Sequence, residues 1–305
     1  MKKIYIAVMA SFLALGANAQ QDPQFSHNMF NRLPVNPGVA GSGGSLCITS
    51  LGRHQWSGFS GQPNTGLISA DMPLPLLHGG VGATFYYDNL GNEKTFAGKL
   101  AYAFRVPLGA GHLGIGADAG VMNKAVSGTW KAPDGTNGQN DQSIPQTFSA
   151  TAPDFSFGLY YNTDRMYVGV SSTHLSASQI KDGSVKYMMA RHYYVMAGYA
   201  YDAGTLLQIK PSILAKTDAA STQLDINLLA DYNNQFWGGV SYRLQDAIVA
   251  LVGVKFGSFR VGYSYDITTS KIRGYSSGSH EIMLGYCFKP MDKKPTQKHH
   301  SVRFL

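Results

Sequence analysis

The sequence predicts an all-β fold, a transmembrane antiparallel up-and-down β-barrel of about fourteen strands. Three observations predict it. Residues 81–288 repeat segments of roughly ten residues that alternate apolar with polar or small side chains, and turns separate the segments. Charged residues make up only 14% of the chain, against about 25% in a soluble domain. After residue 19 there is no apolar run of about 18 residues, so strands rather than a helix would have to cross a bilayer.

Residues 1–19 are predicted to be a cleaved signal peptide. Lys2 and Lys3 form a basic start, residues 4–15 are apolar, and residues 17–19 read Ala-Asn-Ala, a small-residue cleavage site. The mature chain would then begin at Gln20, and no cysteine follows that site to carry a lipid anchor. An exported chain with amphipathic strands and no spanning helix indicates the bacterial outer membrane.

The barrel is predicted to occupy residues 43–288. Its fourteen predicted strands are residues 45–54, 64–72, 80–88, 96–106, 112–126, 154–161, 166–175, 191–202, 206–216, 222–232, 235–243, 247–256, 258–267 and 279–288. Side chains of a strand point to opposite faces with period two. Leu224, Ile226 and Leu228, for example, alternate with Asp225 and Asn227. We expect the apolar set to face lipid and the polar set to face the lumen.

The predicted connections alternate in length along the chain. The long ones include residues 127–153, 176–190 and 268–278, and the tight ones include residues 162–164, 203–205 and 233–234. Outer-membrane barrels have short periplasmic turns and longer extracellular loops. Because the strand number is even, both chain termini are expected in the periplasm. Residues 73–79 are an exception, a long proline-rich connection on the predicted periplasmic side.

The net charge of +7 belongs mostly to the two ends of the chain. Residues 289–305 hold five basic residues and one acidic residue, which predicts a basic periplasmic tail. Lys2 and Lys3 lie in the predicted signal peptide, so the remaining chain is close to neutral. Because no basic patch is left, nucleic acid is not expected as a partner.

Specific motifs follow the cleavage site and end the chain. Residues 21–31 read Gln-Asp-Pro-Gln-Phe-Ser-His-Asn-Met-Phe-Asn, residues 36–41 read Asn-Pro-Gly-Val-Ala-Gly, and residues 53–65 read Arg-His-Gln-Trp-Ser-Gly-Phe-Ser-Gly-Gln-Pro-Asn-Thr. The last three residues are Arg-Phe-Leu. Together these motifs resemble the PorP/SprF family of outer-membrane proteins of the Bacteroidota, which belongs to the type IX secretion and gliding-motility machinery. The chain departs from the family pattern at residues 38–39, with Gly-Val for alanine and an aromatic residue, and at residues 301–302, with Ser-Val for Asn-Pro.

The resemblance implies a non-enzymatic outer-membrane component that works with the periplasmic ring and other type IX secretion parts. It also implies a role in the export or surface anchoring of one large secreted adhesin. Some members serve one substrate and others serve the general machinery, and both alternatives stay open. The expected partners are therefore outer-membrane lipid, the periplasmic components and a secreted adhesin.

Residues 20–42 are predicted to be an N-terminal periplasmic or lumenal segment. They lack period-two alternation and contain Pro23, Pro34 and Pro37, so they are not a spanning strand. One interpretation is an element that plugs the barrel or contacts a partner, and the other is an ordered lead-in that caps the barrel mouth. The candidate partner-binding residues here are Gln21, Asp22, Pro23, Phe25, Asn36 and Pro37.

Two further places are candidates for partner binding. Trp56 and Phe59 lie in the first outward loop, either as an exposed recognition surface or as interfacial aromatics folded into the barrel mouth. Arg303, Phe304 and Leu305 end the basic tail, which either docks on a periplasmic partner or is simply solvated.

Cys47 and Cys287 are the two cysteines, at the start of the first predicted strand and near the end of the last. These strands are neighbours in a closed barrel, so a disulfide across the seam is one alternative to two free thiols.

Charged residues of lumen parity either tune a pore or, as we favour, pair across strands in a hydrated interior. They are Lys210, Asp225, Asp231, Arg243, Lys255, Arg260 and Asp266. The histidines show no metal-ligand spacing, and we find no cofactor motif and no catalytic Ser-His-acid set. The preferred function is therefore docking within type IX secretion, and the alternative is a channel for small solutes or hydrophobic compounds.

Overall fold

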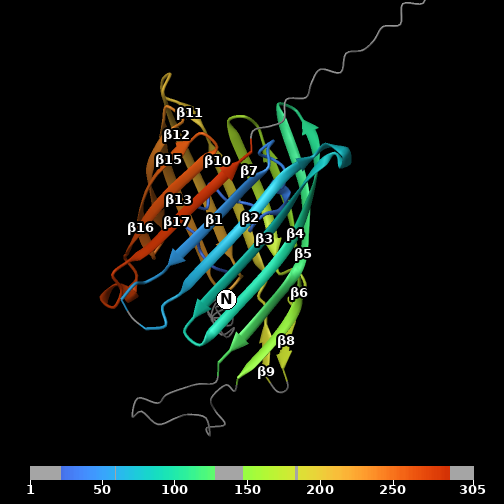
Figure 1. Cartoon of the computed structure of the whole chain (residues 1–305), viewed down its shortest axis with the longest axis vertical. Helices are drawn as coiled ribbons and strands as arrows, with labels where there is room; N and C mark the ends of the chain where they lie inside the picture. The colour runs from blue at the N-terminus through green and yellow to red at the C-terminus, as the bar shows by residue number, and fades with distance from the viewer. Residues whose placement is uncertain (1–21, 59, 128–146, 183–184, 289–305) are drawn as a thin grey trace, which may run out of the picture.

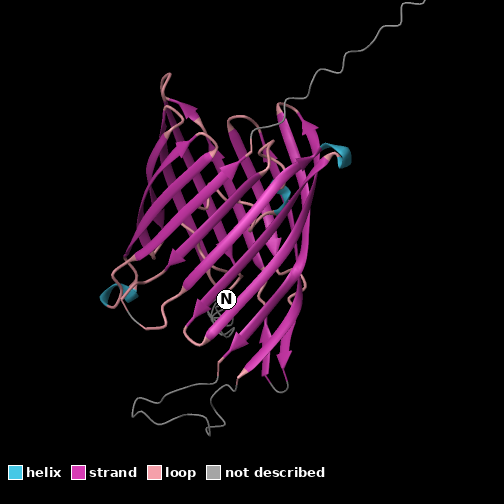
Figure 2. Cartoon of the chain, viewed as in Figure 1, coloured by secondary structure: helices cyan, strands magenta, loops and turns pink. Residues whose placement is uncertain are grey.

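The computed structural model describes residues 22–58, 60–127, 147–182 and 185–288. These residues form a closed antiparallel β-barrel with short 3-10 helices in its connections (Figures 1 and 2). The main sheet has fifteen strands, of which fourteen make the wall and one, β11, is a two-residue addition. The predicted fold class is confirmed. Among the described residues, no helix is long and apolar enough to cross a membrane.

The wall strands occur in the predicted order. They are β1 (Cys47–His54), β2 (Asn64–Leu74), β3 (Gly79–Leu90), β4 (Glu93–Leu108), β5 (Gly111–Val126), β6 (Phe148–Asn162), β7 (Met166–Thr173), β10 (His192–Tyr199), β12 (Leu207–Thr217), β13 (Thr222–Tyr232), β14 (Phe236–Arg243), β15 (Ala247–Phe256), β16 (Phe259–Thr268) and β17 (Ser279–Cys287). A separate hairpin joins β8 (Gln179–Asp182) to β9 (Val185–Met188), and β11 (Tyr201–Asp202) pairs with β12. The described 3-10 helices are η1 (Pro37–Val39), η2 (Pro75–Leu77) and η4 (Lys271–Gly274).

Some boundaries differ from the prediction. β6 starts at Phe148, opposite Val126 of β5, so the connection predicted over residues 127–153 is shorter. The predicted loop at residues 176–190 contains the β8–β9 hairpin. The strand predicted over residues 191–202 is interrupted at Ala200, between β10 and β11.

The proline-rich stretch at residues 73–79 is a compact turn rather than a long exception. β2 and β3 stay paired until Leu74 meets Gly79. Between them η2 turns the chain, and His78 takes a left-handed conformation with φ of 52°. Its N–H donates to the carbonyl of Pro75 at 3.1 Å, which closes the turn.

Two seams close the cylinder. β1 pairs with β17 from Cys47 opposite Cys287 to His54 opposite His280, and β10 pairs with β12. The structure joins Cys47 to Cys287 by a disulfide with an S–S distance of 2.08 Å. The first and last wall strands are therefore linked by backbone hydrogen bonds and by a covalent bond.

The barrel has a turn end and a loop end. The turn end carries the tight connections at residues 75–78, 109–110, 163–165 and 257–258, and the loop end carries residues 55–63, 174–191 and 269–278. In Figure 1 the turn end is at the top, with η2, and η4 lies at the bottom. β1 starts and β17 finishes at the turn end, as an even strand number requires.

Asp22, however, lies at the loop end, because the segment before β1 runs back through the lumen. Its carboxylate accepts hydrogen bonds from Thr173, the last residue of β7, and from His174. The described chain therefore starts and finishes at opposite ends of the barrel. A periplasmic location for both termini stays a prediction.

The side chains alternate between an outer and an inner face as predicted. On β17, Ile282 and Leu284 are 54% and 53% exposed, whereas Glu281 and Met283 are fully buried. Apolar side chains stand outward around the wall, as lipid contact requires. The strand pattern thus separates a lipid-facing surface from the interior.

The lumen is less polar than predicted. A cluster of inward-facing apolar side chains from six wall strands is buried there: Leu51, Leu67, Leu229, Trp237, Val249, Leu251 and Met283. Met29 belongs to the same cluster, and Phe25 and Phe30 pack against it. These side chains can face inward because the N-terminal segment covers them.

Candidate functional site

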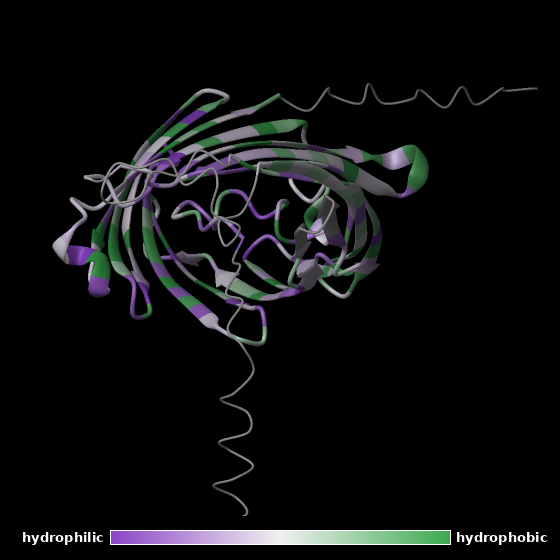
Figure 3. Cartoon of the chain, turned by 90° about the horizontal axis from the view of Figure 1, so that it is seen from below, coloured by the Kyte–Doolittle hydropathy of each residue, from purple (hydrophilic) through white to green (hydrophobic). Residues whose placement is uncertain are grey.

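The most distinctive feature of this barrel is the chain inside it. Viewed along the barrel, an irregular coil lies within the ring of strands (Figure 3). Residues 22–41 are termed the plug. They run from His174 at the loop end to the turn end, where the N–H of Gly41 donates to Asp71 of β2 at 2.8 Å. The plug bonds individually to side chains and backbone groups of the wall rather than along a strand ladder, which explains its lack of strand periodicity.

The loop-end anchor of the plug is Asp22. Its carboxylate accepts hydrogen bonds from the Tyr194 hydroxyl at 2.7 Å, from His174 Nε2 at 2.8 Å and from the Thr173 hydroxyl at 3.3 Å. Lys216 Nζ donates to the Asp22 carbonyl at 3.0 Å. Residues at the loop-end tips of β7, β10 and β12 thus bind one plug residue.

His174 lies between two carboxylates. Its Nε2 is 2.8 Å from Asp22 Oδ1 and its Nδ1 is 2.9 Å from Asp154 Oδ2, and its side chain is 5% exposed. Burial alone would lower the pKa of His174. The negative charge of Asp22 and the hydrogen bonds to Asp154 and Asp22 outweigh burial and raise that pKa to about 9. The ring is therefore a cation at neutral pH and bridges the plug to β6.

Asp22, His174 and His192 also bring possible metal-ligand atoms within 4.8 Å of one another. No sequence spacing indicated this grouping. Both ring nitrogens of His174 already face carboxylates, and His192 Nε2 accepts the Asp22 backbone N–H at 3.3 Å. A metal ion would have to displace a proton that the two carboxylates stabilise. These contacts suit an anchor for the plug better than an ion site.

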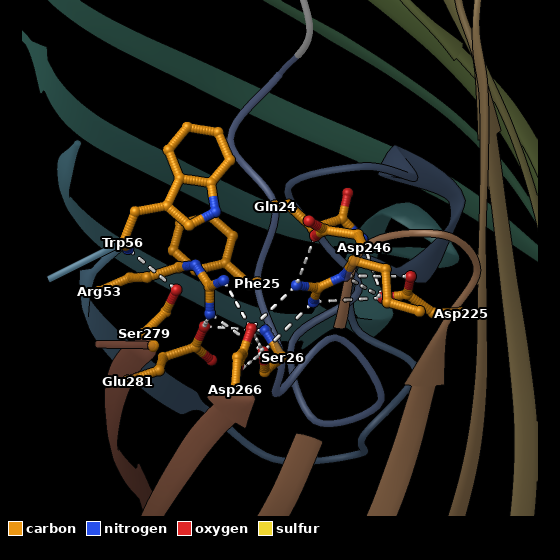
Figure 4. Close-up of polar contacts among 12 residues, drawn as sticks. Gln24, Phe25, Ser26, Arg53, Trp56, Asp225, Asp246, Asp266, Ser279 and Glu281 are labelled. Atoms are coloured by element: carbon orange, nitrogen blue, oxygen red, sulfur yellow. Dashed lines mark hydrogen bonds and ion pairs between the residues drawn. The ribbon is translucent and has the colours of Figure 1, made fainter. Parts of the chain in front are cut away.

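A second anchor surrounds Ser26 and His27, and Figure 4 shows Ser26 among its partners from the wall. The backbone N–H groups of both residues donate to the two oxygens of Glu281, each at 2.8 Å, and His27 Nδ1 lies 2.7 Å from the same carboxylate. The Ser26 hydroxyl donates to Asp266 at 2.8 Å and accepts from Arg53 at 3.0 Å. The plug therefore completes a polar cluster built by β1, β16 and β17.

The wall charges at this anchor alternate in sign. Consecutive ion pairs join Glu281 to Arg53 at 3.1 Å, Arg53 to Asp266 at 2.7 Å, Asp266 to Arg243 at 2.9 Å, and Arg243 to Asp225 at 3.3 Å. Each of these side chains is at most 1% exposed. Buried charges are tolerated only when they are paired and hydrogen-bonded. Without the plug, Glu281 would lose its bonds to Ser26 and His27, so the plug is part of the folded core.

The turn-end anchor is η1 with its cap. Asn36 Oδ1 accepts the N–H of Gly38 at 2.9 Å, and Asn36 Nδ2 donates to the Leu159 carbonyl of β6 at 3.1 Å. The backbone of Gly38 lies directly against β5 and β6. Three wall glycines leave room for this approach, since a Cβ on any of them would collide with the plug: Gly114, Gly116 and Gly158.

Five of the predicted site residues lie in the plug but not in one group: Asp22, Pro23 and Phe25 belong to its loop-end half, whereas Asn36 and Pro37 lie at its turn-end anchor. Trp56 lies at the loop end, where its backbone N–H donates to the Ser279 hydroxyl of β17 at 3.0 Å (Figure 4). Trp56 and Pro23 line a loop-end cavity of about 520 Å³. The other predicted site residues lie outside the described residues: Gln21, Phe59, Arg303, Phe304 and Leu305.

The sequence reasoning missed Ser26, His27, Arg53 and Glu281. Arg53 and Glu281 have lumen parity in their strands, which was the available signal, but strand parity does not tell which charges meet. Pairing across strands, the favoured interpretation of the other lumen charges, is confirmed for two sets. Arg243 pairs with Asp225 and Asp266, and Lys210 pairs with Asp231 at 2.8 Å.

A family model described as "Type IX secretion system membrane protein PorP/SprF" matches residues 17–286. The chain belongs to the PorP/SprF family. The match covers most of the chain, so the resemblance of the N-terminal and loop motifs is confirmed. No curated protein matches the chain significantly.

Solved structures of similar fold are distant. They include Omp33 of Acinetobacter baumannii, with 8% identity, a TM-score of 0.47 and coverage of 80% of this chain and 98% of that chain. The toluene transporter TbuX of Ralstonia pickettii has 12% identity, a TM-score of 0.49 and coverage of 83% and 92%. A Pseudomonas aeruginosa FadL homologue has 12% identity, a TM-score of 0.43 and coverage of 81% and 90%. These likenesses concern the outer-membrane barrel fold alone.

Family membership makes the chain a membrane component of the type IX secretion system. A closed antiparallel barrel with an apolar outer face is the architecture of outer-membrane proteins. The chain therefore contacts membrane lipid and works with other components of the secretion system.

Proposed function

We propose that this chain is a non-enzymatic docking component of the type IX secretion and gliding apparatus. It holds periplasmic machinery at the outer membrane, assists the export or surface anchoring of a secreted adhesin, or does both. One observation carries the proposal: residues 22–41 of the chain itself occupy the lumen, with Ser26, His27 and Asn36 at most 1% exposed. A barrel with an occupied interior suits a membrane anchor whose rims make the functional contacts.

The apolar part of the lumen wall supports the same proposal. Leu51, Val249, Leu251 and Met283 face inward and are at most 2% exposed, and Met29 of the plug packs against this cluster. A water-filled channel has a polar interior. The alternative function, a channel for small solutes or hydrophobic compounds, requires the plug to leave and this apolar wall to meet water. That cost argues against it.

The proposed orientation follows from the connections. The turn end faces the periplasm, because short turns lie on that side of outer-membrane barrels. The basic tail at residues 289–305 then begins on the periplasmic side, and its last residues, Arg303, Phe304 and Leu305, are the proposed docking group. Trp56 then lies on the outer side, where an exported adhesin passes, and Phe59, outside the described residues, is a proposed contact for the same partner.

In this proposal the N-terminal candidate residues support the barrel from inside and do not contact a partner directly. Asp22, Pro23, Phe25, Asn36 and Pro37 fill and brace the lumen. Asn36, for example, is fully buried and bonded to the β6 backbone. Residues 1–19 are proposed to be the signal peptide that directs the chain to the membrane, and Gln21 lies between that peptide and the plug.

Truncation of the tail tests the docking proposal. Deleting residues 302–305 is expected to leave the barrel folded, as seen by heat-modifiable migration on gels, and to abolish type IX export in the native host. A matched control replaces residues 302–305 by four alanines, which keeps the length and removes the Arg-Phe-Leu ending. Normal export by the truncated protein would overturn the role of the tail.

Solute flux separates docking from transport. The purified protein in liposomes is expected to pass small sugars no faster than empty liposomes, while the full-length protein co-purifies with periplasmic ring components in mild detergent. Flux comparable to that of an open porin, with no ring components recovered, would favour the channel and refute the docking proposal.

A further inference from the structure

The ladder between β10 and β12 is interrupted near the turn end. β10 pairs with β12 as far as Gly198, and pairing resumes at Tyr201 of β11. Pro211 of β12 lies opposite the gap and has no N–H to donate. The N–H of Ala200 donates instead to the Arg165 carbonyl at 2.7 Å. The wall therefore lacks the regular interstrand pairing between β10 and β12 at this position.

An apolar groove of about 340 Å³ lies in the wall at the interruption. Outward-facing Val168, Ile213 and Ile226 line it, each at least 42% exposed. Inward-facing Ser212 and Asn227 also line it, at 8% and 2% exposed. The groove thus lies on the lipid-facing side of the wall, over β7, β10, β12 and β13, and its lining includes residues of both parities.

A cavity of about 400 Å³ lies on the lumen side of the same place and opens at the turn end. The groove and the cavity have a common boundary formed by Met166, Tyr167, Tyr199, Pro211 and Ser212. The groove and the cavity therefore lie on the two sides of the same stretch of wall, where the β10–β12 ladder is broken.

The cavity holds two arginines without an acidic partner. Among the described residues, neither Arg32 nor Arg260 has a carboxylate within ion-pair distance. Arg32 lies on the Tyr167 ring at 3.7 Å and donates to the Tyr160 hydroxyl at 2.9 Å, and its Nε is buried with no hydrogen-bond partner. Arg260 lies 5.3 Å from the Phe30 ring. Both guanidinium groups lie over aromatic rings, and within the described part of the chain Arg32 Nε is a buried donor without an acceptor.

The remaining charges near the cavity offset these two arginines only in part, since Asp231, the acid that acts on Arg260, also pairs with Lys210. Arg165 pairs with Asp202 at 2.9 Å and Lys210 pairs with Asp231 at 2.8 Å, so those acids are already engaged. Asp164, the acidic residue in the lining, is in the exposed turn between β6 and β7. The cavity is therefore basic, and it adjoins an apolar groove that faces the bilayer.

We propose that this place binds an anionic phospholipid. One acyl chain lies in the apolar groove, and the phosphate enters the cavity between Arg32 and Arg260. Arginine binds phosphate through several charge-assisted hydrogen bonds, and a phosphate oxygen supplies the acceptor that Arg32 Nε lacks. Arg32 belongs to the plug, so the bound lipid bridges plug and wall. This ligand is additional to the docking function proposed above and does not depend on it.

Native mass spectrometry of the full-length protein in detergent tests the proposal. Dioleoyl-phosphatidylglycerol is expected to bind at least about tenfold more tightly than dioleoyl-phosphatidylcholine. Arg260→Gln removes a phosphate donor, and Ala197→Phe fills the groove that Ala197 lines. Each variant is expected to lower phosphatidylglycerol binding about tenfold and to leave weak phosphatidylcholine binding unchanged. Ala197→Phe keeps every charge, so it still tests the lipid site if Arg260→Gln folds poorly.

Two matched controls distinguish a specific site from general attraction. Lys255→Gln removes a cation near the turn end that bonds to Asn234 at 3.2 Å and is not part of the cavity lining. Ala250→Phe adds the same bulk to the outer face of β15. Both controls should keep the wild-type preference.

Three results would overturn the proposal. They are equal binding of the two lipids, an equal loss in Lys255→Gln, and unchanged phosphatidylglycerol binding in Ala197→Phe. A further arm adds inorganic phosphate alone. If free phosphate stabilises the protein against heat as strongly as the lipid does, the site recognises a soluble anion and the lipid assignment is wrong.

Discussion

Replacing His174 with glutamine is expected to weaken the loop-end anchor of the plug in a pH-dependent way. Burial lowers the pKa of His174, but the negative charge of Asp22 and the hydrogen bonds to Asp154 and Asp22 outweigh burial and raise the pKa to about 9. The other charged or titratable groups at this anchor are His192, Tyr194 and Lys216, which contact Asp22, and Lys99, which pairs with Asp154 at 2.7 Å. Glutamine keeps hydrogen-bonding capacity at a similar size and removes the positive charge.

The pKa shift of His174 gives the magnitude of the effect. A histidine in the unfolded chain titrates near 6.5, and each pKa unit corresponds to about 1.4 kcal/mol. A folded pKa of about 9 is therefore worth about 3 kcal/mol of stability. Because the folded pKa is the higher one, this contribution is fully present below about pH 6.5 and is lost as the pH rises through about 9.

Urea unfolding of the lipid-reconstituted protein, followed by tryptophan fluorescence, measures this contribution. The His174→Gln variant is expected to be less stable than the wild type by about 3 kcal/mol near pH 6, and the difference should close near pH 10. His112→Gln is the matched control, since His112 is exposed on β5 and has no ion pair among the described residues. A difference of the same size at all pH values would refute the ion-pair explanation.

Three further predictions concern the plug and the seam. Glu281→Gln removes a buried charge paired with Arg53 and is expected to lower the free energy of unfolding by about 3–5 kcal/mol in the same titration. Gly116→Val forces a side chain into the plug backbone and is expected to raise ion conductance in planar bilayers, because the turn end of the plug must move. Cys47→Ser removes a cross-link across 240 positions and is expected to lower the free energy of unfolding by up to about 5 kcal/mol relative to the oxidised wild type.

Each of these predictions has a contrary result. A loss below about 1 kcal/mol for Glu281→Gln would mean that water replaces the plug contacts at little cost. Gly66→Val is the control for the conductance experiment, since a Cβ at Gly66 meets open space. Equal conductance of the two variants would contradict the prediction that the plug blocks ion flow through the barrel. Equal stability of oxidised and reduced wild type would show that the β1–β17 ladder alone holds the seam.

Much of the wall could be predicted from the sequence because its rule is local. Lipid is uniform, so any apolar side chain of the correct parity satisfies the outer face, and alternation such as Ile282 and Leu284 around Met283 identifies a strand without its partners. The family motifs at the start of the chain were readable for the same reason. They consist of consecutive residues.

The functional site depended on contacts that no local pattern encodes. Ser26 meets Asp266 from 240 positions away and His27 meets Glu281 from 254 positions away, and both contacts require the correct register around the whole barrel. The tight turns and the even strand number correctly predict at which end of the barrel each strand starts and finishes. They do not predict that the plug, residues 22–41, runs back through the lumen.

By itself, the sequence determined the fold class, the strand order, the lipid-facing side of each strand and the family. The tertiary structure alone decided that residues 22–41 occupy the lumen, that Asp22 lies at the loop end, and that the wall is interrupted at Ala200. The physical reason is the range of the interactions. A bilayer selects each outward side chain one at a time, whereas a buried charge such as Glu281 is stable only when Arg53 and the plug reach it together.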